Sequence, residues 1–160
     1  MATKVFVGLG SNLGDSRTTV RCAARALASL GYGVALSPLY RTVPQSIALQ
    51  PPYINAVAAF YTAWPPDTLL TLLLHIEARF GRFRRARGES RTLDLDLLLY
   101  GDAQVAANGL MIPHPRILER RFVLEPLWAL EPDLILPGGI PVAQALLRTA
   151  RQGVVVDAMD

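Results

Sequence analysis

Two aspartates stand two positions apart in the apolar segment RTLDLDLLLY, residues 91–100. The leucines predict a β-strand, in which residues i and i+2 share a face at a spacing of about 6.6–7 Å. One face is expected to carry Asp94, Asp96, Leu98 and Tyr100, and the other Leu93, Leu95, Leu97 and Leu99. Two like charges about 6 Å apart repel by roughly 3 kcal/mol at an effective dielectric near 20, and a cation between them would convert that repulsion into binding.

The carboxylate pair allows two interpretations. It can be the solvent-facing side of an edge strand, where acids need no ligand. It can also hold Mg²⁺, which binds few protein groups and completes its shell with water and substrate phosphates. Two carboxylates can support a pair of ions about 3.5–4 Å apart, an arrangement that clamps both sides of a phosphoryl displacement.

An arginine-rich segment, RFGRFRRARGESR, leads directly into this strand. It holds six arginines between Arg79 and Arg91. The planar guanidinium fork matches phosphate oxygens, so the segment indicates an anionic partner, either a nucleic acid or a polyphosphate. Cationic side chains beside a metal-binding carboxylate pair indicate phosphoryl transfer more strongly than either feature does alone.

Four further polar or aromatic residues are candidates with structural alternatives. Glu77 lies on a predicted helix, where a surface salt bridge is the ordinary role. His114 stands between two prolines in IPHPR and can be structural or can contact a phosphate. Tyr53 and Asn55 begin a predicted strand on one face, where they can stack on and read a flat heterocycle or simply fill the end of a sheet.

The glycine-rich turn GLGSNLG, residues 8–14, follows a predicted strand and precedes a helix. Its spacing is G-x-G-x-x-x-G, and the next strand lacks the acidic residue expected about 20 positions on in a dinucleotide site. The chain also has no Walker A sequence. The glycines therefore serve either the backbone freedom of the turn or the close approach of a ligand.

Composition places the chain among globular proteins of one domain. It has 160 residues, 51% hydrophobic and 18% charged, with a net charge of +3. The start MATKVFVGLGSN does not resemble a signal peptide, and no apolar run is long enough for a transmembrane helix. The single cysteine, Cys22, excludes an internal disulfide framework. We expect a soluble cytoplasmic protein with residues 1–160 forming one catalytic domain.

The order of predicted elements is β-α-β, a loop, and again β-α-β. Strands are expected over 3–10, 32–42 with a disturbance at Pro38, 53–64 and 93–100, and at the edge over 153–157. Helices are expected from Asp15 or Ser16 to Gly31, from Pro65 or Pro66 to Phe80, in one or two short pieces over 111–130, and over 141–150. Two split β-α-β units predict an α+β, ferredoxin-like αβα sandwich with a mostly antiparallel sheet.

Seven segments occur in an order that resembles the hydroxymethyldihydropterin pyrophosphokinase family of folate biosynthesis. They are VGLGSNLGD, YRT, YINA, IEARFGRFR, RTLDLDLLLYG, IPHP and RRFVLEPL, and the resemblance runs from about residue 4 to 137. The Arg-x-x-Asp-Leu-Asp motif is its most specific part. The resemblance implies the same ferredoxin-like fold and transfer of pyrophosphate from ATP to the hydroxymethyl group of the dihydropterin, with release of AMP.

The resemblance also implies roles for individual residues. Asp94 and Asp96 match the carboxylates that hold two Mg²⁺, and Asp96 is our candidate to take the hydroxyl proton. Arg82 and Arg91 match loop arginines that assist transfer and act when the segment 81–91 is ordered by the substrates. ATP contacts are expected from Glu77, Arg84, His114 and Arg120, and pterin contacts from Thr42, Tyr53, Asn55 and Phe122. Family members often have Trp-Gly-Pro just before the motif arginine, whereas the run that ends at Arg91 in this chain is RGESR, which is one residue shorter and has no Trp.

The expected partners are therefore the small molecules ATP and hydroxymethyldihydropterin. We expect the protein to be a monomer that binds neither nucleic acid nor a membrane. An RNA-binding module of the same fold class is the main alternative. It would need an aromatic strand of the RNP1 type, which GRFRRARG is not, and the acidic pair would repel RNA phosphates. A non-catalytic ATP-binding protein is the other alternative, and AMP formation separates it from the enzyme.

Overall fold

The computed structural model describes residues 1–42, 51–81, 92–107 and 109–157. Its helical elements are α1 (Ser16–Ala26), η1 (Leu27–Ser29), α2 (Pro66–Arg79), η2 (Ile117–Glu119), α3 (Arg121–Leu130) and α4 (Val142–Arg148). Its strands are β1 (Thr3–Ser11), β2 (Tyr32–Leu36), β3 (Tyr40–Thr42), β4 (Tyr53–Thr62), β5 (Asp94–Tyr100), β6 (Val105–Ala107), β7 (Leu110–Ile112), β8 (Ile135–Leu136), β9 (Ile140–Pro141) and β10 (Val154–Val156).

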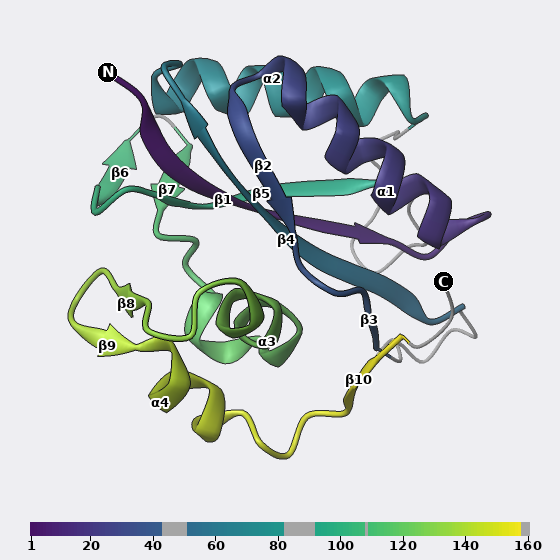
Figure 1. The fold of residues 1–160 in the computed structure, drawn as a ribbon, viewed down its shortest axis with the longest axis vertical. Helices are drawn as coiled ribbons and strands as arrows, with labels where there is room; N and C mark the ends of the chain where they lie inside the picture. The colour runs from purple at the N-terminus through teal and green to yellow at the C-terminus, as the bar shows by residue number, and fades with distance from the viewer. Residues whose placement is uncertain (43–50, 82–91, 108, 158–160) are drawn as a thin grey trace.

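One six-stranded antiparallel sheet organises the molecule (Figure 1). Its strand order is β10-β3-β4-β1-β5, and β2 also pairs with β4. The order β5-β1-β4, followed by β2 and β3, is the result of two interleaved β-α-β units. The predicted α+β, ferredoxin-like sandwich is thus confirmed.

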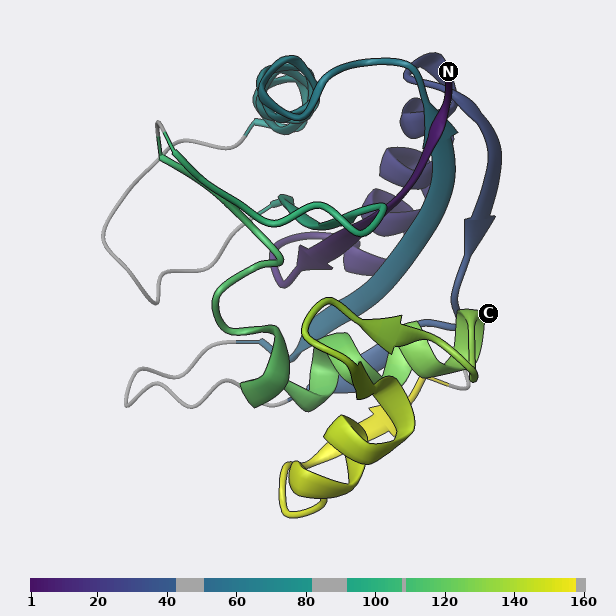
Figure 2. The same cartoon turned by 90° about the vertical axis from the view of Figure 1, so that its left-hand side faces the viewer.

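Helices cover both faces of this sheet (Figures 1 and 2). The face under α1 and α2 buries Val7, Leu9, Phe60, Leu73 and Leu95 among its core residues. The opposite face packs against α3 and α4 through a second core that includes Phe6, Val57, Leu98, Leu124 and Leu127. No helix in the described part of the chain has the length and apolar character needed to cross a bilayer.

The element boundaries follow local rules that the sequence already contained. Asp15 caps α1 by accepting hydrogen bonds from the backbone N–H of Thr18 at 3.2 Å and from its hydroxyl at 2.8 Å. Pro66 begins α2 at its first turn, as predicted. The single strand expected over 32–42 is instead two strands, β2 and β3. The chain breaks around Pro38, which has no N–H for a ladder.

A β-bulge in β5 changes which of its side chains share a face. Phe6 pairs with Leu99 and Val7 with Leu97, so Leu98 is an extra residue between two ladder positions. Leu95 and Leu97 lie in the core under α1 and α2, but Leu99 packs into the core under α3, and Tyr100 contacts the α1–α2 core. The expectation that Leu99 shares the Leu97 face and Tyr100 the aspartate face was wrong, because simple alternation ends at Leu98.

The C-terminal strand prediction is confirmed, because β10 pairs with β3 and lies at one edge of the sheet. Two small ribbons, β6–β7 and β8–β9, were not predicted. Each has strands of only two or three residues, too short for a period-2 pattern to be read.

Candidate active site

A cavity of about 550 Å³ opens on the α3 side of the sheet. Strands β1, β3, β4, β5 and β10, the start of α3 and the turn before β10 contribute to its wall. It brings together seven of the residues that the sequence singled out, namely Thr42, Tyr53, Asn55, Asp94, Asp96, Arg120 and Phe122. These residues are up to 80 positions apart in the sequence, so the fold assembles them.

The two aspartates face the cavity beside two glycines of the neighbouring strand. In the antiparallel register Asp94 pairs with Gly10 and Asp96 with Gly8. All four residues line the cavity. Neither glycine has a positive φ, so neither is needed for its backbone conformation. Their lack of a side chain leaves room in the cavity beside the aspartates. A Cβ on Gly10 would lie 3.1 Å from Oδ1 of Asn55, which is tighter than most real contacts.

The carboxylate pair fits Mg²⁺ by its chemistry. No group of three or more His, Cys, Asp or Glu side chains that could hold a metal occurs within the described ranges. Mg²⁺ does not need such a cage, because one or two carboxylates with water and substrate phosphates complete its octahedral shell. Asp94 and Asp96 are both partly exposed to the cavity, where a triphosphate could reach the same ions.

The predicted pterin-binding residues line the cavity near the start of β4. The amide Nδ2 of Asn55 donates a hydrogen bond to Oγ1 of Thr42 at 2.9 Å, across the β3–β4 pair. This bond fixes the orientation of an amide that is only 8% exposed. Tyr53, at the start of β4, and Phe122, in the first turn of α3, bring two aromatic side chains to the same cavity.

Arg120, at the N-cap of α3, places a cation against this cavity, as Arg116 also does. Its guanidinium carbon lies 5.5 Å from the centre of the Phe122 ring. Burial and the neighbouring Arg116 lower the pKa of Arg120, whereas Asp96 and Asp94 act in the opposite direction. An arginine remains a cation after such a shift, so the cavity presents positive charge facing its carboxylates.

His114 is held next to the site by its backbone and its ring. Its N–H donates to the carbonyl of Leu98 at 3.0 Å, and its Nδ1 accepts from the N–H of Arg116 at 3.2 Å. Burial, followed by the charge of Arg120, lowers the pKa of His114. The ring is therefore neutral at physiological pH and carries its proton on Nε2, the nitrogen left to donate. His114 does not line the cavity itself.

Glu77 lies farther inside than its expected ATP contact suggests. It is 3% exposed, and its Oε2 accepts a hydrogen bond of 2.6 Å from the backbone N–H of Leu95. It therefore attaches α2 to the strand segment between Asp94 and Asp96. It does not line the cavity, and its expected contact with ATP remains a prediction.

Three predicted residues, Arg82, Arg84 and Arg91, lie outside the described residues. Other residues line the cavity without having been singled out, including Arg116, Glu119, Gln152 and Val154. Arg116 and Glu119 form an exposed ion pair at 3.3 Å. The sequence could have indicated the glycines of GLG as site residues, since their i, i+2 spacing matches that of Asp94 and Asp96. No feature of the sequence pointed to Gln152.

Comparison with known proteins identifies the family. A family model described as 7,8-dihydro-6-hydroxymethylpterin-pyrophosphokinase (HPPK) matches residues 6–132. A 2-amino-4-hydroxy-6-hydroxymethyldihydropteridine pyrophosphokinase of Pseudomonas aeruginosa is 41% identical over 156 residues, which is 96% of each chain. The protein of that name from Methylorubrum extorquens is 40% identical and covers 95% of this chain and 97% of its own.

Solved structures add a likeness of fold. A crystal structure of HPPK-DHPS in complex with substrates has a TM-score of 0.72 at 13% identity, over 92% of this chain and 43% of that one. A Plasmodium falciparum HPPK-DHPS with pterin and p-hydroxybenzoate gives a TM-score of 0.70 at 13% identity, over 92% and 42%. The match over most of the sequence and the identity to full-length relatives show that this chain belongs to the 7,8-dihydro-6-hydroxymethylpterin-pyrophosphokinase family.

Proposed function

We propose that this protein transfers pyrophosphate from ATP to 6-hydroxymethyl-7,8-dihydropterin in tetrahydrofolate biosynthesis. The products are AMP and the pterin diphosphate. One observation carries the proposal: a single cavity is lined by a carboxylate pair, an oriented amide and two aromatic side chains. The carboxylates suit a metal-bound triphosphate, and the amide and aromatic side chains suit a flat heterocycle with polar edges.

The pterin is proposed to stack between Tyr53 and Phe122. Asn55 would read the polar edge of the ring, because Thr42 already uses one of its amide protons and thereby fixes its orientation. The carbonyl oxygen and the second amide proton of Asn55 would then serve the ligand. Thr42 would contribute a backbone contact from the neighbouring strand. Such a set selects a heterocycle that offers both donors and acceptors.

ATP is proposed to lie between the carboxylates and the arginines. Arg120 would contact its phosphates from the α3 side, and His114 would donate from Nε2. Glu77 and Arg84 complete the ATP contacts that the family resemblance implies. Arg82 and Arg91 would assist the transfer itself, stabilising negative charge that develops on the phosphates.

The reaction forms one bond and breaks one. The hydroxymethyl oxygen of the pterin attacks the β-phosphorus of ATP, and the bond between that phosphorus and the oxygen bridging to the α-phosphate breaks, releasing AMP. The hydroxyl proton leaves as the new bond forms, and Asp96 is proposed to accept it. Two Mg²⁺ would be held by Asp94 and Asp96, and when bound they neutralise the triphosphate and lower the pKa of the attacking hydroxyl.

We further propose that residues 1–160 act as one catalytic domain, as a monomer in the cytoplasm. Both cores pack on the two faces of one sheet, which supports a single folding unit. The proposed substrates are small water-soluble molecules that need neither a membrane nor nucleic acid.

The test is AMP formation from ATP and Mg²⁺, with and without hydroxymethyldihydropterin, followed by chromatography of the nucleotides. We expect AMP and pterin diphosphate in equal amounts, and only when the pterin is present. ADP as the product, or the absence of any nucleotide turnover in a folded protein, would refute the proposed reaction.

A further inference from the structure

We propose that Gln152, in the turn before β10, is a positioning residue that holds Arg120 and Phe122 in place across the cavity. This role rests on the proposed function, because Arg120 and Phe122 are the proposed ATP and pterin contacts at the start of α3. Gln152 lies outside the segment 6–132 that matches the family model. Its role follows from this fold alone.

The side-chain amide of Gln152 binds the backbone on both sides of Arg120. Its Nε2 donates to the carbonyl of Glu119 at 2.7 Å, and its Oε1 accepts from the N–H of Arg121 at 2.9 Å. Only this orientation of the amide gives each atom a suitable partner, since a carbonyl must accept and an N–H must donate. The peptide groups flanking Arg120 are therefore both tied to one side chain.

The bond to Arg121 also completes the start of α3. The first N–H groups of a helix have no partner within the helix, and Arg120, at the N-cap position, makes no side-chain capping bond. Gln152 supplies the missing acceptor from 31 residues away. Phe122 is in the first turn of the helix that this bond fixes. A cap of this kind reduces fraying of the turn that carries the aromatic ring.

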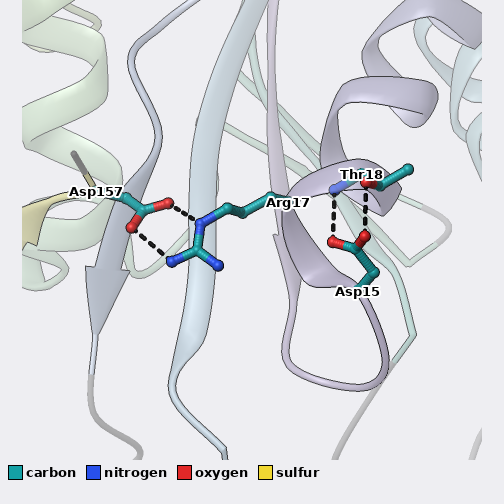
Figure 3. A network of polar contacts seen from close by, with 4 residues as sticks. All are labelled: Asp15, Arg17, Thr18 and Asp157. Atoms are coloured by element: carbon teal, nitrogen blue, oxygen red, sulfur yellow. Dashed lines mark hydrogen bonds and ion pairs between the residues drawn. The ribbon is translucent and has the colours of Figure 1, made fainter. Parts of the chain in front are cut away.

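Gln152 is itself anchored by the strand that follows it. Val154 pairs with Thr42, so the C-terminal segment bridges β3 and the start of α3. At the far end of the segment, the backbone N–H of Asp157 donates to the carbonyl of Leu39 at 2.8 Å. The Asp157 carboxylate accepts hydrogen bonds from Nε and Nη2 of Arg17, the second at 2.8 Å (Figure 3). The segment 152–157 is thus fastened to α1, β3 and α3.

This geometry connects the two halves of the proposed pterin site. Thr42 and Asn55 stand on the β3–β4 side and Phe122 on the α3 side. Residues 152–154 line the same cavity, and they contact both sides, through Val154 paired with Thr42 and Gln152 bonded to Arg121. A loss of the Gln152 bonds would leave the sheet side intact and would release the α3 side. Ligand affinity, more than folding, should therefore report the change.

The direct test replaces Gln152 with Met, which keeps a similar length and removes both hydrogen bonds. Two neutral hydrogen bonds of ordinary strength correspond to roughly tenfold in binding. We expect the Kd of the pterin, measured with Mg²⁺ and a non-hydrolysable ATP analogue, to rise about tenfold. Thr149→Val is the control, because it removes only the side-chain bond from the Thr149 hydroxyl to the carbonyl of Leu146, and Thr149 does not line the cavity. The backbone carbonyl of Thr149, which accepts from the N–H of Gln152 at 3.1 Å, is kept in this variant.

A double-mutant cycle separates positioning from a general structural role. If Gln152 acts through Phe122, then Gln152→Met should weaken pterin binding less than threefold in the Phe122→Ala background. The same tenfold loss in that background would overturn the proposal, as would a wild-type Kd in the single variant. The Gln152→Glu variant retains an acceptor for the N–H of Arg121, so it should bind the pterin more tightly than Gln152→Met does. Equal pterin affinity of the two variants would refute the role of this capping bond.

Wild-type AMP formation is measured alongside. Its absence would refute the proposed reaction, whereas an active wild type with an unaffected Gln152→Met variant would refute only the role of Gln152.

Discussion

Gly10→Ala is expected to weaken pterin binding although it adds only a methyl group. The new Cβ would lie 3.1 Å from Oδ1 of Asn55, so one of the two groups must move by a few tenths of an ångström. Asn55 is held by its 2.9 Å bond to Thr42 and is almost fully buried. Gly10 itself is part of β1, between Asn55 on β4 and Asp94 on β5. The side chain of Asn55 is therefore the group that gives way.

The cost follows from the bond that Asn55 loses or strains. A displaced amide weakens its hydrogen bonds to Thr42 and to the pterin edge. This weakening should reduce the free energy of pterin binding by about 1 to 2 kcal/mol. The Kd of the pterin should rise about 5- to 30-fold. Fluorescence or calorimetric titration with Mg²⁺ and a non-hydrolysable ATP analogue present measures it. The midpoint of thermal unfolding shows whether the variant is folded at the temperature of the titration.

The matched control is the same change in an Asn55→Ala background. Without the amide the added methyl meets nothing at that position, so Gly10→Ala should then change the pterin affinity less than twofold. A wild-type affinity of the folded Gly10→Ala single variant would refute the inference that the added methyl displaces the amide of Asn55. An equal loss in both backgrounds would show that the methyl acts on the ligand directly and not through Asn55.

Three further outcomes are expected. Tyr53→Ala and Phe122→Ala should each weaken pterin binding by about 1–3 kcal/mol in the same titration, and unchanged affinity in both would place the pterin elsewhere. Arg91→Ala should lower kcat more than ATP affinity in steady-state assays, whereas a change in KM alone would make it a ground-state contact. Burial lowers the pKa of His114 below its ordinary 6.5, so protonation favours the unfolded state. The wild type should therefore lose folding stability relative to His114→Gln as the pH falls below about 6.5. Denaturant titrations measure this loss, and parallel pH profiles of the two proteins would contradict it.

The sequence predicted the parts of this fold that depend on local pattern. Leucine and aspartate alternation placed Asp94 and Asp96 on one face of a strand, and the cap residue Asp15 and the proline pair at 65–66 placed the helix starts. The alternation failed from Leu99 onward. The reason is a bulge, which depends on how β5 pairs with β1 and leaves no mark in the leucine-rich sequence.

The site was predictable where a motif carried it and not where pairing created it. Gly8 and Gly10 stand opposite the aspartates only because the antiparallel register of β1 and β5 sets them there. Gln152 meets the start of α3 through a turn and a short edge strand that no periodicity specifies. The expected contact of Glu77 with the nucleotide stays a prediction, and the hydrogen bond from the backbone N–H of Leu95 to its buried carboxylate is a second role that the sequence did not indicate.

The most direct test of the central claim is AMP formation by Asp94→Asn and Asp96→Asn, titrated with Mg²⁺ at saturating ATP and hydroxymethyldihydropterin. Asn keeps the size of each side chain and removes the charge that would hold the ions, so the fold should be unchanged by circular dichroism. We predict that both variants show no measurable AMP formation at any Mg²⁺ concentration at which the wild type is saturated. Turnover close to that of the wild type in either folded variant would contradict the account.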